Sequence, residues 1–157
     1  MRTLPQRISF DPFSFLKITQ RQNKDILEFL LAEFEIYISL PTLHSYLLAK
    51  AIRNMNISKE LEDLKEIFRI VDTSNELLEK MAKIESVLVK DSIFVDFDNL
   101  MTAVSAIVTN SLLVVNNEDS KDYEPFIKYG LDFISYKKFL EEIEALAEEE
   151  AKKEKIL

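Results

Sequence analysis

The segment from Asp96 to Asp122 holds the residues of this chain whose types and spacing best suit chemistry. It reads DFDNLMTAVSAIVTNSLLVVNNEDSKD, in which acids precede a run of small residues and a strand-like LLVV precedes Asn-Asn-Glu-Asp. A helix dipole stabilises an acid in the first turn, and polar residues just beyond a buried strand are where α/β proteins assemble binding sites. The segment therefore predicts a site built from oxygen atoms, with Asp98 at the start of a helix expected over 97–109.

Alternating strand and helix signals predict the elements that would position these residues. Short strands are expected at 8–10, 35–39, 68–71, 112–115 and 131–134. Helical spacing of apolar residues separates them, and Thr73 and Glu76 have the T-x-x-E spacing of a capping box. Strands separated by helices favour a parallel sheet with helices on both faces. We expect an α/β fold: one three-layer α/β/α domain over 1–157 with a mostly parallel sheet, in which 148–157 is a frayed charged helical tail.

Composition limits the classes of function. The chain has 157 residues, 47% of them hydrophobic, which suffices for one core. A net charge of -8 disfavours non-specific attraction to nucleic acid or anionic membranes, so a phosphate-rich partner would need a local basic patch or a bound cation. The absence of Cys excludes disulfides and thiolate chemistry, and one Gly leaves no glycine-rich phosphate loop. With no apolar run long enough to cross a bilayer, we expect a cytoplasmic protein without a membrane partner.

Residues with oxygen-bearing side chains follow the predicted strands. The carboxyl ends of these strands should meet at one edge of the sheet. The residues are Asp11 after the first strand, Ser39 and Thr42 after the second, Asp72 after the third, and Asn116, Asn117, Glu118 and Asp119 after the fourth. The lone histidine, His44, has no paired His or Cys, so a zinc site is not expected. Ser45 has no convincing base partner and is not a candidate nucleophile.

Four segments, taken in this order, resemble the PIN domain, a family of metal-dependent ribonucleases that includes VapC-type toxins. They are ISFDPFSFLK, ISLPTLHSYLLAK, DNLMTAVSAIVTNSLLVVNN and GLDFISYKKFL, and the resemblance spans about 7–140. The resemblance implies an endoribonuclease that uses Mg²⁺ or Mn²⁺. In that chemistry carboxylates and waters hold the metal ion, and the ion lowers the pKa of a water that attacks a phosphodiester.

The acids of the family map unevenly onto this chain. The first and third fall on Asp11 and Asp98, which the resemblance implies to be catalytic. The second, usually a Glu, falls on Ser45, so this ligand is missing. The fourth falls on Asn117, after Val115 in place of the family's Thr, and Asp119 and Asp122 lie close enough to stand in. The expected metal ligands are Asp11, Asp98, Asn117 and Asp119, and the expected substrate contacts are Ser39, Thr42, Ser45 and Asn116.

These residues also have ordinary structural explanations. Asp11 could cap the segment after its strand, Asn117 is a common turn residue, and Asp119 could be a solvated loop charge. If the chain behaves like VapC-type toxins, RNA would be its substrate, and it would pair with a small antitoxin and form a homodimer through apolar helix faces.

Two alternatives stay open. The missing acid at Ser45 suits a degenerate PIN fold that acts as an RNA-binding or protein-interaction module. A response-regulator type of α/β domain is the weaker alternative, because that fold expects a lysine at the end of its last strand. Here the strand at 131–134 runs into Ser135 and Tyr136.

Overall fold

Five short parallel strands form the centre of the part of the chain that the structure describes, residues 3–156 of a computed structural model. The strands lie in the order β3-β2-β1-β4-β5. Their bounds are β1 (Arg7–Phe10), β2 (Glu35–Ile38), β3 (Arg69–Ile70), β4 (Leu112–Val115) and β5 (Phe133–Ser135). Every neighbouring pair is parallel, so the predicted α/β class with a mostly parallel sheet is confirmed.

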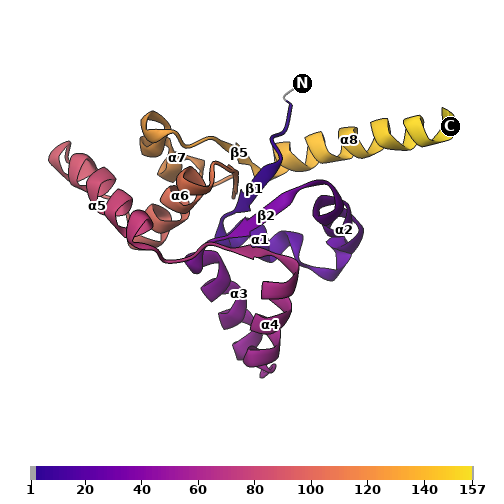
Figure 1. Cartoon of the computed structure of the whole chain (residues 1–157), viewed down its shortest axis with the longest axis horizontal. Helices are drawn as coiled ribbons and strands as arrows, with labels where there is room; N and C mark the ends of the chain where they lie inside the picture. Colours follow the sequence, from indigo (N-terminus) through magenta and orange to yellow (C-terminus); the bar gives the residue numbers. More distant parts are fainter. Residues whose placement is uncertain (1–2, 157) are drawn as a thin grey trace.

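Helices connect the strands and cover both faces of the sheet (Figure 1). Those before β4 are α1 (Pro12–Ile18), the 3-10 helix η1 (Arg21–Asn23), α2 (Lys24–Glu33), α3 (Leu40–Ile52), α4 (Ile57–Ile67), α5 (Asn75–Lys90) and α6 (Phe97–Thr109). Those after β4 are α7 (Ser120–Tyr123), the 3-10 helix η2 (Glu124–Tyr129) and α8 (Tyr136–Ile156). None of the helices in the described residues is both long and apolar enough to cross a membrane.

The β4 strand shows how the sequence divides the core into two layers. All four of its residues are buried, as expected for a parallel strand covered on both faces. Because side chains alternate along a strand, Leu112 and Val114 pack in the cluster that includes α1 to α4 and α8. Leu113 and Val115 pack against α5, α6 and α7 on the other face. The sheet is therefore the middle layer of three.

The register of the two central strands sets the position of the candidate site. Phe10 in β1 lies beside Val114 in β4, and the next backbone N–H, that of Asp11, donates to the carbonyl oxygen of Val114 at 2.9 Å. The carboxyl ends of both strands are thus level. Residues that leave the sheet after β1 and after β4 consequently emerge side by side.

Several boundaries differ from those predicted. Ser74, not Thr73, caps α5, because the Ser74 hydroxyl accepts the N–H of Leu77 at 3.1 Å. The last strand was expected at 131–134 and lies at Phe133–Ser135. The tail expected as a charged helix over 148–157 is helical to Ile156, and Leu157 lies outside the described residues. Figure 1 shows α8 reaching away from the sheet as one extended helix.

Candidate acidic active site

Asp11 occupies the point where β1 ends and α1 begins. Its Oδ1 accepts the N–H of Ser14 at 2.8 Å, which caps α1, and its Oδ2 accepts the N–H of Asn116 at 3.0 Å. Pro12, at the first position of α1, has no N–H to satisfy and already has the φ of a helix. Backbone groups from two separate segments therefore fix both oxygens of this carboxylate.

Burial makes the ionised form of Asp11 costly. Only 1% of the residue is exposed. Desolvation raises the pKa of its carboxyl above the usual value, and the nearby carboxylate of Asp119 raises it further, while the hydrogen bonds from Asn116 and Ser14 lower it. The net shift is upward. A cation beside Asp11 would favour the charged form that burial opposes.

The start of α6 brings two more acids to the site. Asp96 is the N-cap of α6, and its Oδ1 accepts the N–H of Asn99 at 2.7 Å. Asp98 lies in the first turn and is exposed. A carboxylate in this position is stabilised by the helix dipole and remains accessible to a hydrated ligand.

The segment after β4 supplies the third group of polar residues. The Asn116 amide donates to Asp119 at 3.2 Å and accepts from the Lys17 ammonium at 2.7 Å. The hydroxyl of Tyr123, in α7, donates to Asn99 Oδ1 at 3.2 Å, which joins α7 to α6. Burial raises the pKa of Tyr123 strongly, and the surrounding carboxylates raise it further, with Asp11 the largest contributor. Tyr123 is therefore a neutral hydrogen-bond donor.

These elements surround a single cleft of about 510 Å³. Five of its lining residues are acids, namely Asp11, Asp96, Asp98, Asp119 and Asp122. Phe13, Phe97, Ser45 and Tyr123 line it as well. Within residues 3–156, its lining contains no Lys or Arg. The cleft is thus acidic, with aromatic rings beside the acids.

Four of the residues expected at the site from sequence lie together in this cleft. Asp11, Asp98 and Asp119 line it, and Ser45 does so at the position of the family's second acid. Asp96 was not predicted as a site residue, although the Asp-Phe-Asp sequence placed it two residues before Asp98. Its N-cap role already accounts for one of its oxygens.

Asn117, one of the expected ligands, lies apart from the others. Its side chain is turned toward the start of α8, where Oδ1 accepts the N–H of Lys137 at 3.2 Å, and it does not line the cleft. The residue two positions on, Asp119, lies in the cleft instead. The loop between β4 and α7 therefore brings Asp119 to the cleft, two residues later than the resemblance implies.

Three expected substrate contacts also have structural roles. Thr42 has no exposed surface and donates to the carbonyl oxygen of Phe10 at 2.8 Å. Ser39 is buried and donates to Thr42 Oγ1 at 3.4 Å. Thr42 thus ties α3 to β1, and the Ser39 hydroxyl is engaged by Thr42 within the protein. Asn116 is half-buried and connects Lys17, Asp11 and Asp119 rather than lining the cleft.

The donors in the cleft fit a hard divalent cation by type, because Mg²⁺ and Mn²⁺ prefer carboxylate oxygens. Among the described residues no three His, Cys, Asp or Glu side chains gather closely enough for a ready-made metal site. Mg²⁺ usually keeps several waters and binds through one or two carboxylates. The arrangement therefore suits a hydrated ion held by few protein ligands.

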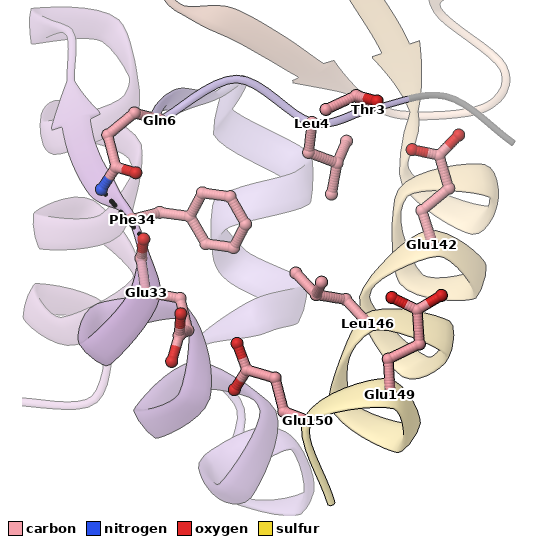
Figure 2. A pocket seen from close by; sticks show the side chains of 9 residues that line it. All are labelled: Thr3, Leu4, Gln6, Glu33, Phe34, Glu142, Leu146, Glu149 and Glu150. Carbon is pink, nitrogen blue, oxygen red and sulfur yellow. Dashed lines mark hydrogen bonds between the residues drawn. The ribbon is translucent and has the colours of Figure 1, made fainter. Parts of the chain in front are cut away.

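A second cavity, of about 420 Å³, lies at the opposite end of β1. Figure 2 shows Glu142, Glu149 and Glu150 of α8 on one side of it, and Glu33 and Phe34 on the other. The cavity shares no lining residue with the acidic cleft. It is therefore a separate feature of the α8 packing and contributes nothing to the candidate site.

Comparison with known proteins gives one curated relative and several similar folds. No family model matches the chain. A VapC ribonuclease of Pyrococcus furiosus is 39% identical over 147 residues, which cover 94% of this chain and 97% of that protein. The solved structure of VapBC-1 from nontypeable Haemophilus influenzae matches with a TM-score of 0.62 at 17% identity, over 83% of this chain and 98% of that chain.

Two solved structures with bound DNA have the same fold. VapBC2 from Rickettsia felis, bound to a fragment of its promoter, matches with a TM-score of 0.61 at 17% identity and covers 82% of this chain and 98% of that one. DNA-bound VapBC from Salmonella typhimurium matches with a TM-score of 0.62 at 14% identity, over 84% and 99% of the two chains. At these identities the structural matches establish the fold alone.

Because the pKa of Asp11 is raised, the difference in stability between Asp11→Asn and the parent should depend on pH. Below the usual value of 3.8 the carboxyl is protonated in both the folded and the unfolded chain. As the pH rises through 3.8 toward the raised folded pKa, the unfolded chain loses this proton first, so this group lowers the free energy of unfolding progressively. Asp11→Asn cannot ionise, so its stability relative to the parent should increase between pH 4 and pH 7.

Urea unfolding in a chelator, measured across this pH range, checks the prediction. Asp25→Asn, which changes an exposed acid in α2, is the matched control. A difference between Asp11→Asn and the parent that stays constant with pH would contradict it. The other titrating groups are the same in the variant and the parent, so their contributions to the free energy of unfolding cancel in the difference.

Proposed function

The chain belongs to the family of VapC ribonucleases, and from this premise we propose that it hydrolyses RNA at the acidic cleft with the help of Mg²⁺ or Mn²⁺. The observation that carries the proposal is the arrangement of Asp11, whose two oxygens are fixed by backbone N–H groups although burial disfavours its charge. Fixing a buried carboxylate in this way is expensive for folding and suits a group that meets a cation.

Asp11, Asp98 and Asp119 are the proposed metal ligands, because they come from three different elements and line the same cleft. A bound divalent ion would supply a water of lowered pKa as the nucleophile. The residues of the chain position the ligands: the backbone of Ser14 and Asn116 orients Asp11, and the Asn116 amide orients Asp119.

Charge supports a metal-dependent reaction over a metal-free one. The chain carries a net charge of -8, and none of the described residues lining the cleft is basic. A phosphodiester entering such a cleft is repelled by the carboxylates unless a cation lies between them. The alternative function, a degenerate PIN module without catalysis, is less well supported because the curated relative that matches along nearly its whole length is named a ribonuclease.

We further propose that the chain pairs with a small antitoxin, forms a homodimer and acts in the cytoplasm. The solved structures with the same fold are named as VapBC complexes. Leu48 and Ile52 are exposed one helical turn apart on α3, and Met55, just beyond the end of the helix, is exposed as well; we call these three residues the apolar face on α3. Exposed apolar residues of this kind are typical of a protein interface.

Hydrolysis of a structured RNA by the purified protein in Mg²⁺ or Mn²⁺ tests the reaction. The double variant Asp11→Asn, Asp98→Asn should lose activity by at least about a hundredfold, because even outer partners of metal ligands affect activity by 10–100-fold. The double variant Asp25→Asn, Asp63→Asn, which removes two exposed acids on α2 and α4, is the matched control. Equal activity in the parent and the Asp11, Asp98 variant would point to a contaminating nuclease.

Restoring the missing acid should tighten metal binding. Ser45 lines the cleft at the position of the family's second carboxylate. Ser45→Glu adds a hard oxygen ligand, so calorimetric titration should show a lower Kd for Mn²⁺, by about tenfold. Ser45→Gln, which adds a similar side chain without the charge, is the control. If both variants bind Mn²⁺ as the parent does, Ser45 is not at the metal site.

The apolar face on α3 gives a test of the homodimer. Ile52→Glu places a charge in the middle of this face and should convert a dimer into a monomer, as measured by light scattering with size-exclusion chromatography. Lys59→Glu, an exposed change on α4, is the control. A parent protein that is monomeric at all concentrations would exclude the homodimer, and a dimer that survives Ile52→Glu would exclude this face.

A further inference from the structure

A basic pocket lies outside the acidic cleft, near the carboxyl ends of α1 and α3. Its volume is about 560 Å³, and its charged lining residues are Arg21, Lys50 and Arg53. Within residues 3–156 its lining contains no Asp or Glu. Arg21 is the first residue of η1, Lys50 is in the last turn of α3, and Arg53 is the C-cap of α3. Three cations from two elements therefore gather in one pocket of a chain whose net charge is -8.

The fold does not pair these three cations with carboxylates. Among the described residues, Arg21, Lys50 and Arg53 take part in none of the ion pairs. The Lys50 ammonium lies 5.1 Å from the centre of the Tyr46 ring, which also lines the pocket. Like charges gathered in one pocket repel one another, and an anion bound between them would offset this repulsion. The pocket is therefore chemically suited to an anionic group.

Helix stability explains only part of this cluster. The dipole of α3 favours cations at its carboxyl end, which accounts for Lys50 and Arg53. Arg21 lies in the connection between α1 and α2, and the effect of a helix dipole fades beyond the end turns of the helix. The presence of Arg21 beside the other two cations therefore has no explanation in the helix dipoles.

The basic pocket adjoins the acidic cleft. Leu16 of α1 lines both of them. On α3, Ser45 lines the cleft and its neighbour Tyr46 lines the pocket. A helix rises about 1.5 Å per residue, which puts Arg53 about 12 Å along α3 from Ser45. A polymer that occupies the cleft can therefore continue over Leu16 into the pocket.

Affinity for nucleic acid normally comes from Lys and Arg contacts to phosphates, and the described lining of the acidic cleft has no basic side chain. We propose that Arg21, Lys50 and Arg53 bind backbone phosphates of RNA outside the cleft and so anchor the strand that the acids hydrolyse. The inference rests on the proposed ribonuclease function and adds a second contact with its substrate. Phosphate contacts position a strand without reading its sequence. The pocket therefore supplies affinity and leaves the choice of the cleaved bond to the cleft.

Binding of a fluorescent oligoribonucleotide in a chelator, measured by anisotropy at several salt concentrations, tests the pocket without hydrolysis. On a single strand, each contacted phosphate contributes a slope of about -0.7 to the logarithm of the binding constant against the logarithm of the salt concentration. The triple variant Arg21→Gln, Lys50→Gln, Arg53→Gln should make this slope shallower by about 2 and raise the Kd at low salt by at least about tenfold. Arg21→Lys, Lys50→Arg, Arg53→Lys keeps the charges and should keep the slope.

Lys80→Gln, Lys83→Gln, Lys90→Gln is the matched control. It removes three exposed cations from α5, and Lys90, like Lys50, is in the last turn of its helix. None of the three lines the pocket or the cleft. The control changes the net charge by the same amount, so any general effect of charge appears in both variants. Equal slopes and equal Kd values in the two triple variants would overturn the inference.

Steady-state cleavage with Mn²⁺ separates this inference from the proposed function. The triple variant of the pocket should raise KM by about tenfold and leave kcat within about twofold, because its cations lie outside the cleft. If the parent cleaves RNA and this variant keeps its KM and its salt slope, the pocket is not a phosphate site and the proposed function stands. If the parent does not cleave RNA but binds it through the three cations, the proposed function fails and the pocket stands. A parent that neither binds nor cleaves RNA overturns both.

A second copy of the chain is the competing occupant, because Met55 belongs to the apolar face on α3 and also lines the pocket. If the triple variant of the pocket keeps the RNA affinity of the parent but changes its mass in light scattering, the cations serve a protein interface and the inference is overturned. Urea unfolding shows whether a loss reflects folding. If the triple variant is unfolded, Arg21→Gln, Arg53→Gln changes two exposed side chains and should make the salt slope shallower by about 1.4.

Discussion

The carboxylate of Asp11 is the constraint on which the remainder of the site depends. It accepts one N–H from the first turn of α1 and one from Asn116 just beyond β4, so it joins two segments that are about a hundred residues apart in sequence. If this carboxylate were lost, α1 would lose its cap and the end of β4 its partner. The residues that would bind a metal ion are therefore also the residues that hold the strand ends in place.

Keeping the Asp11 carboxylate charged has an electrostatic cost, which the hydrogen bonds from Ser14 and Asn116 relieve only in part. The cleft contains five acids, and the Lys17 ammonium donates to the Asn116 amide oxygen. Burial and Asp119 both raise the pKa of Asp11. Active sites commonly keep such unfavourable groups at the expense of stability. The negative charge of the cleft therefore favours the approach of a cation.

Sequence patterns predicted the long and strongly periodic elements well. The limits of α6 and β4 were predicted to the residue, because the small apolar run and the LLVV strand have clear periods and clear ends. The short helices α1 and α7 were not predicted, since seven and four residues are too few to show a helical period.

The site was predicted in part, for a physical reason. Asp11 and Asp98 follow directly from a strand end and a helix start, which are local features. The choice between Asn117 and Asp119 depends on the path of a loop, and on the Lys137 N–H that engages the Asn117 side chain. The burial of Thr42 likewise depends on the contact of α3 with β1. The spacing of residues in the sequence does not reveal such tertiary contacts.

The absence of an acid at Ser45 is consistent with the electrostatics of this cleft. A carboxylate there would face Asp11, whose pKa is already raised, and like charges at a shared site disfavour ionisation of each other. In the absence of metal, the added repulsion would weaken the hydrogen bonds that fix the Asp11 turn. A serine leaves the turn intact in the metal-free protein and reduces the number of protein ligands available to an ion. In the metal-free protein a serine at this position therefore adds no further charge to the cleft that holds the buried carboxylate of Asp11.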